Sequence, residues 1–290
     1  RMKNKDSSYY VPEQSAWPIL GALALLFLAF GSLNLEKKWG LIAFIIGIAG
    51  LVFMLSGWFW NVTQESNAGL YNQQMDKTFR WGMLWFLISE LFLFGLLMGS
   101  IIHVRFSITS WLAGQSGDAS QLTHYLLWPD FAKHWPLLPP SSFSATVAST
   151  PSLGSLRQIP FINLIILLFS ALLLTGALYY LKKARYKLCR LNLNLAIFLA
   201  CIFFISQTYY FIHLIHTHII TKSGIYGSFL IAFLGLHLLN IAAALLFLSI
   251  LCFRIYHNQL LEKNAFSFDA AVWWWDFLAV ILALAFFLIF

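Results

Sequence analysis

Apolar residues fall into seven long blocks along this chain, and short polar or turn-rich stretches separate them. The blocks cover residues 17–34, 39–60, 80–103, 159–181, 190–214, 224–254 and 269–290. Each is longer than the roughly 17 residues that a helix needs to cross the hydrocarbon core of a bilayer. Runs such as 161–169 lack the apolar–polar alternation of a barrel strand. The pattern therefore predicts an all-α integral membrane bundle of seven transmembrane helices.

Composition supports the same class. Hydrophobic residues make up 60% of the chain and charged residues only 10%, and 28 Phe and 12 Trp raise the aromatic share. A soluble domain of 290 residues needs far more surface charge than this. The net charge of +7 would suggest a nucleic-acid partner in a soluble chain, whereas in a membrane protein it reflects orientation.

Lys and Arg are distributed unevenly over the alternate connections. The N-terminus and the connections after the second, fourth and sixth blocks hold 12 of them, and the opposite connections hold 6. Because basic loops stay on the cytoplasmic or matrix side, this bias places the N-terminus there and, with seven crossings, the C-terminus on the other side. We expect a bacterial inner membrane, with the mitochondrial inner membrane as the alternative.

One long connection divides the chain. Residues 107–157 are rich in Ser, Thr, Pro and Gly, and the aromatic stretch 127–136 predicts partial order through packing and turns. We therefore expect three parts: residues 1–106 with the first three helices, an extramembrane loop over 107–157, and residues 158–290 with the last four helices.

Glu90 is the most unusual residue in the apolar blocks. It stands near the middle of the third block, about 14 Å from the helix start at roughly 1.5 Å per residue. An unpaired charge at that depth costs several kcal/mol, so the carboxyl is protonated, paired, or directed to a polar cavity. The plainest interpretation is a protonated acid that is hydrogen-bonded within the bundle.

Histidines are the other candidates for intramembrane chemistry. His237 lies in the sixth block with Asn240 one turn later, so the two share a helix face and can bond each other, a lipid or a neighbouring helix. No second histidine in any block is placed to complete a haem or copper site. His213, His216 and His218 gather near a helix end without a carboxylate or cysteine, which favours an interfacial cluster over a metal site.

Four stretches, in this order, carry a family resemblance. They are Ser15-Ala-Trp-Pro18; Phe79-Arg-Trp-Gly-Met83 leading to Ser89-Glu90; Ser223-Gly-Ile-Tyr-Gly-Ser228 with Gly235-Leu-His237; and Phe268-Asp-Ala-Ala-Val-Trp-Trp-Trp275. In these stretches, and over nearly its whole length, the chain resembles subunit III of the haem-copper cytochrome c oxidases.

The resemblance implies a subunit without a redox centre, in a complex that couples oxygen reduction to proton translocation. Haem and copper would belong to subunits I and II, and cytochrome c would donate the electrons. Subunit III would contact subunit I directly, and a V-shaped cleft filled with phospholipid would divide its helices 2 + 5. The chain would support proton uptake and the stability of the oxygen-reducing core.

The resemblance also assigns residues. Glu90 falls on the family's intramembrane carboxylate, and Arg80 falls on an arginine at the interface, from which it can reach a lipid phosphate. The alternative for Arg80 and Glu65 is a solvated helix boundary. Tyr226 lies among small residues typical of close helix packing. The complete set of expected lipid-binding or proton-linked residues is Glu90, Arg80, His103, Glu65, Trp58, His237 and Tyr226.

Departures from the family pattern mostly remove ionisable groups. Asn61 and Gln64 stand where the family has Asp and Arg, and Asn240 replaces a second histidine. In the last block, Asp276 and Ala279 stand where the family has a His and a later Asp. These losses bear on proton collection at the surface more than on the fold. Asp276 places a carboxyl group inside a membrane span, and nearby aromatic residues or a neighbouring subunit must accommodate it.

Two other functions are alternatives to this one. A subunit III-like component of a quinol oxidase or nitric oxide reductase system typically lacks the first two helices, and the two blocks over 17–60 argue against it. A self-contained transporter would show interrupted helices in matching halves, and a 2 + 5 division has no such symmetry.

Overall fold

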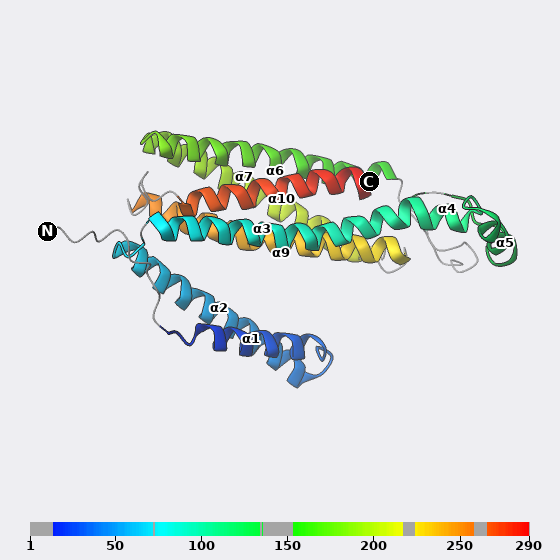
Figure 1. Ribbon diagram of the computed structural model, residues 1–290, viewed down its shortest axis with the longest axis horizontal. Coiled ribbons are helices and arrows are strands. Elements are labelled where there is room, and N and C mark those ends of the chain that lie inside the picture. Colours follow the sequence, from blue (N-terminus) through cyan, green and yellow to red (C-terminus); the bar gives the residue numbers. More distant parts are fainter. Residues whose placement is uncertain are drawn as a thin grey trace. The chain divides into compact units, whose positions relative to one another are not determined.

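The computed structural model describes residues 14–71, 73–133, 135, 153–216, 224–257 and 266–289. This part of the chain is helical throughout, with turns between the helices and no strand (Figure 1). It divides into two compact units, residues 1–81 and 82–290, and each is described by itself. The predicted all-α class is therefore confirmed.

The first unit contains α1 (Trp17–Ser32), α2 (Lys38–Asn67) and the beginning of α3 (Gln73–Ile102). Pro18 lies in the first turn of α1, where its missing amide hydrogen leaves no helical bond unmade. Glycines let α1 and α2 approach closely, because a Cβ on Gly31 would overlap the backbone of Phe44 and one on Gly47 the backbone of Leu28. α1 and α2 thus form a tight antiparallel pair.

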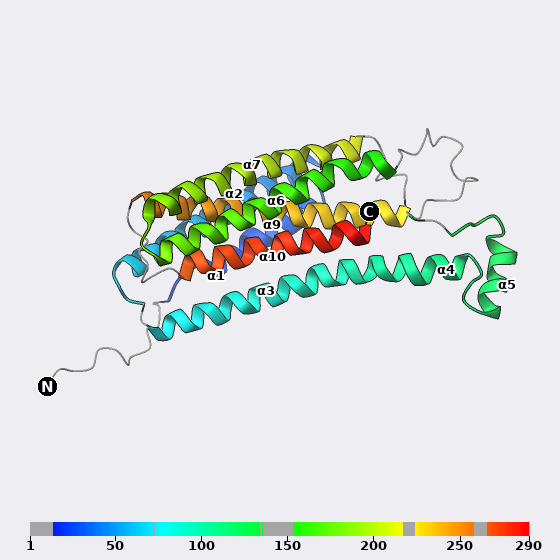
Figure 2. The same cartoon turned by 90° about the horizontal axis from the view of Figure 1, so that it is seen from above.

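The second unit is a helical bundle. After the remainder of α3 come the π-helix η2 (His103–Ile108), α4 (Thr109–Leu112), α5 (Asp118–Leu127), α6 (Leu153–Lys182), α7 (Tyr186–His216), α9 (Gly224–Tyr256) and α10 (Phe266–Ile289). α6 packs on α7 and α10, and α9 packs on the same two helices (Figure 2). This arrangement leaves a core at the centre of four long helices.

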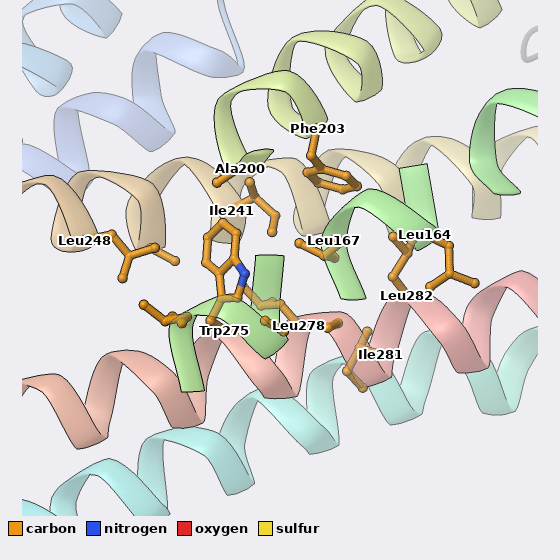
Figure 3. Packing of buried hydrophobic residues seen from close by; sticks show 14 of the residues in the cluster. Leu164, Leu167, Ala200, Phe203, Ile241, Leu248, Trp275, Leu278, Ile281 and Leu282 are labelled. Atoms are coloured by element: carbon orange, nitrogen blue, oxygen red, sulfur yellow. The ribbon is translucent and has the colours of Figure 1, made fainter. Parts of the chain in front are cut away.

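The core of this bundle is apolar and closely packed. Trp275 of α10 is fully buried and lies near Ile241 and Leu248 of α9 (Figure 3). Phe203 of α7 and Leu167 of α6 are also fully buried. On the outward faces large apolar side chains stay exposed, as a surface in contact with lipid chains requires.

Within the described residues, six helices are long and apolar enough to cross a membrane: Lys38–Ser66, Gln74–Leu112, Gln158–Lys182, Tyr186–His216, Gly224–Tyr256 and Phe266–Ile289. They correspond to six of the seven predicted blocks. The block over 17–34 is represented by α1, an apolar helix of 16 residues. At about 1.5 Å per residue it is roughly 24 Å long, shorter than a hydrocarbon core of about 30 Å.

The third helix does not end where the sequence suggested. Instead of giving way to a loop near 103–107, it continues through η2 and α4 to Leu112. Val104 and Thr109 are buried, so contacts with the bundle hold this extension in helical form. Glycines with positive φ, Gly114 and Gly117, then turn the chain into α5. The predicted partial order is thus confirmed over 107–133, whereas residues 136–152 lie outside the described part.

Candidate functional site

Glu90 lies at the middle of α3, one helical turn from Phe86 and one turn from Phe94. Phe86 packs edge-on against Trp274 of α10, with ring centroids 5.2 Å apart. Phe94 is fully buried and packs edge-on against Phe233 of α9 at 5.6 Å. The two aromatic contacts position the Glu90 side chain where α3 meets α9 and α10.

The Glu90 carboxyl group is only partly satisfied in this position. The residue is half-buried, and its Oε2 is buried without a hydrogen-bond partner among the described residues. The Asn240 side chain on α9 is the polar group that interacts with it. A buried carboxyl oxygen without a donor is costly, by about 1–3 kcal/mol, so the site suits a neutral acid or a further donor group.

His237 has a structural hydrogen bond. The residue is fully buried, and its Nε2 donates to the backbone oxygen of Leu278 on α10 at 3.1 Å. Its ring stacks on Phe233 with centroids 6.0 Å apart. Asn240 instead donates to the oxygen of Leu236 in its own helix at 3.2 Å. The sequence left Asn240, a lipid and a neighbouring helix open as partners of His237. The partner in the structure is the neighbouring helix α10.

Three predicted residues belong to the first unit. Arg80 Nε lies 2.9 Å from Asp76 Oδ2, one turn earlier in α3. Glu65 near the end of α2 accepts a hydrogen bond from the Tyr71 hydroxyl at 2.8 Å. Trp58 is exposed and stacks on its neighbour in the sequence. Arg80 and Glu65 thus take part in local polar contacts at a helix boundary.

The two remaining residues lie far from Glu90 within the second unit. His103 is exposed at the start of η2, thirteen residues and about 20 Å along the helix from Glu90. Tyr226 is buried at the beginning of α9, and its ring packs edge-on against Trp135 at 5.5 Å. Within this unit Glu90 and His237 therefore lie together near the centre of the bundle. His103 and Tyr226 lie apart from them, towards the end of the bundle at which α10 ends.

Arg105, which the sequence pattern did not single out, binds the end of α10. Arg105 donates to the Leu288 oxygen at 2.8 Å, and its guanidinium lies 5.4 Å from the centre of the Trp135 ring. Trp135 in turn donates from Nε1 to the Ile289 oxygen at 3.1 Å. Both residues satisfy carbonyl groups that have no helical partner at the end of α10. In the sequence, the available sign of this contact was an isolated arginine, Arg105, just after the apolar block 80–103.

A buried amide network joins α6 to α7. Asn163 Nδ2 donates to Gln207 Oε1 at 2.7 Å, and Ser206 Oγ donates to Asn163 Oδ1 at 2.7 Å. Asn163 and Gln207 are almost completely buried. Interhelical bonds of this kind hold helices together where lipid provides no hydrophobic driving force.

The opposite end of the bundle carries basic residues. Lys182 Nζ at the end of α6 lies 2.7 Å from Asp269 Oδ1 near the start of α10. Next to it, a hydrogen bond with the Tyr179 hydroxyl raises the pKa of Lys183. The Lys183 amine also lies 4.8 Å from the centre of the Tyr179 ring. The Lys182–Asp269 pair therefore links two helices at a charged boundary of the membrane.

Groups that could hold a metal ion are not found in the described ranges, where no three His, Cys, Asp or Glu side chains come together. Of the histidine cluster, His213 is exposed and stacks on Tyr209 at 6.2 Å, His216 is exposed, and His218 lies outside the described residues.

These features define a multi-pass helical membrane protein whose spans are tied by a few interhelical hydrogen bonds. Comparison with known proteins gives its family. The model of the family "Cytochrome c oxidase subunit III" matches residues 7–117 and 151–290. The chain therefore belongs to the cytochrome c oxidase subunit III family.

Individual relatives agree with this assignment. The chain is 25% identical over 283 residues to "Cytochrome c oxidase subunit 3" of Osphranter robustus, covering 97% of this chain and 95% of the relative. It is 27% identical over 282 residues to "Probable cytochrome c oxidase subunit 3" of Rickettsia bellii, covering 96% and 92%. The family makes this chain part of an oxidoreductase complex, and it argues against the quinol oxidase and transporter alternatives.

Proposed function

We propose that this subunit supports the oxygen-reducing core of its complex without carrying a redox centre. It contacts subunit I, binds phospholipid, and assists proton uptake and sustained turnover. Haem and copper belong to subunits I and II, and cytochrome c supplies the electrons. The proposal combines the family assignment with the chemistry of the Glu90 site.

The observation that carries the proposal is the Glu90 Oε2 atom, which is buried and has no hydrogen-bond partner among the described residues. A carboxyl group that is half-buried among aromatic rings, with one oxygen lacking a donor, is rarely retained for packing alone. A proton or the polar group of a bound lipid would satisfy it. Glu90 is therefore the residue through which the subunit would influence proton movement or lipid retention.

Two further parts of the proposal have separate support. The 2 + 5 division with its V-shaped cleft remains a prediction, supported by the close α1–α2 contacts within the first unit. The cytoplasmic N-terminus in a bacterial inner membrane is supported by the two-to-one bias of Lys and Arg.

Purification through a tag on this chain tests the proposal. Mild detergent should yield a complex with haem, copper and phospholipid, and chain that is then separated from its partners should show no Soret absorption. A Soret band from the separated polypeptide would overturn the non-redox assignment. Purification without any haem-bearing partner would overturn the role as a support of the core.

A further inference from the structure

Asp276 is a second intramembrane carboxylate, and the Glu90 site does not use it. It lies ten residues into α10, about 15 Å from the helix start. The residue is half-buried, and its Oδ2 accepts a hydrogen bond from Thr175 Oγ1 on α6 at 3.5 Å. This distance is at the long limit for such a bond, so Thr175 satisfies the carboxylate poorly.

The surface around this pair is apolar. On α6, Leu168 and Leu172 precede the exposed Thr175 at helical spacing, and both are exposed. On α10, Val280 lies one turn after Asp276 and is 55% exposed. The Thr175–Asp276 pair is thus a polar contact within an outward-facing apolar surface, which Leu168 and Leu172 of α6 and Val280 of α10 form together.

The Lys182–Asp269 ion pair does not neutralise this carboxylate. Lys182 and Asp269 each lie seven residues from the Thr175–Asp276 pair, about 10 Å along their helices. Among the described residues, no cation forms an ion pair with Asp276. The chain therefore leaves a carboxylate on a surface where facing lipid would cost several kcal/mol.

We infer that this α6–α10 face docks a transmembrane helix of a neighbouring oxidase subunit, and that this helix presents a hydrogen-bond donor to Asp276. The inference rests on the proposed function, since it requires an assembled complex. Acyl chains have no donor at this depth, and headgroups lie at the membrane boundary. A single polar contact within an apolar face is a typical means of holding two membrane helices together.

A photo-reactive residue tests the inference in the intact complex. Benzoylphenylalanine at Val280 should give, on illumination, an adduct with one polypeptide of another subunit. Because Val280 is exposed, the replacement disturbs no packing within this chain. Adducts only with lipid, or only within the same polypeptide, would overturn the inference.

The carboxylate itself is tested in the same background. Asp276→Leu should lower the adduct yield about fivefold, whereas Asp276→Asn, which keeps an acceptor oxygen, should retain most of it. An unchanged yield in Asp276→Leu would show that Asp276 does not hold the partner. Co-purified haem separates the two claims: a complex with haem but no protein adduct overturns this inference alone, and a preparation without haem overturns the proposed function as well.

Discussion

The His237 imidazole donates to the Leu278 backbone oxygen at 3.1 Å and so ties α9 to α10 in the middle of the bundle. The carbonyl of Leu278 already accepts within its helix, and the histidine uses its second lone pair. Asn240, three residues further along α9, interacts with Glu90 on α3. One turn of α9 therefore contacts α10 and α3 through polar side chains.

Replacing His237 should destabilise this junction. His237→Ala removes a hydrogen bond and leaves a cavity among Phe94, Phe203 and Phe233, which should cost about 2–4 kcal/mol. His237→Gln keeps a donor and should cost less. Unfolding of the purified complex in increasing SDS measures the effect. Equal midpoints for His237→Ala and the parent would show that the bond contributes little.

Glu90→Gln should leave assembly intact and shorten the active lifetime of the oxidase several-fold, because the amide keeps the shape of the side chain but cannot exchange a proton. Oxygen consumption during prolonged turnover, with phosphate per haem, measures both expected effects. Ser89→Ala is a matched control, since Ser89 is exposed and bonds to the Phe86 oxygen in its own helix. If the Gln variant ages like the parent, Glu90 has only a structural role.

The Asn163–Gln207 pair should behave as a coupled unit. Gln207→Leu alone leaves the Asn163 amide buried without that acceptor and should cost about 1–2 kcal/mol. Replacing both by Leu should cost less than the sum of the two single changes, with a coupling of about 1 kcal/mol. SDS unfolding of the four proteins gives this value. Strict additivity would contradict a direct contribution from the bond.

Gly31→Ala should disrupt the α1–α2 pair, because the added Cβ would overlap the backbone of Phe44 and one of the helices must shift. Overpacking of this kind typically costs about 1–3 kcal/mol. Gly95→Ala on α3 is the control, since a Cβ there meets no atom within 4 Å. Limited proteolysis of the complex should show faster cleavage in Gly31→Ala only. Equal cleavage of the two variants would mean that α1 and α2 tolerate separation.

Hydrophobic pattern predicted the class and most of the spans because a bilayer imposes the same requirement on each helix separately. Length and apolarity identified α2, α3, α6, α7, α9 and α10. The end of α3 was missed, since the polar composition after Arg105 reads as a loop. Contacts of Arg105 and Trp135 with the end of α10, more than 150 residues away in sequence, keep that segment ordered.

The candidate site shows the same division. Sequence alone determined that Glu90, His237 and Asp276 are polar groups inside spans, because their depth follows from position within an apolar block. Only the tertiary structure decided that Glu90 meets Asn240, that His237 bonds Leu278, and that Asp276 lies on an outward face beside Thr175. Depth is a property of one helix, whereas a partner depends on how helices are rotated and packed against one another, which close contacts distant in sequence determine.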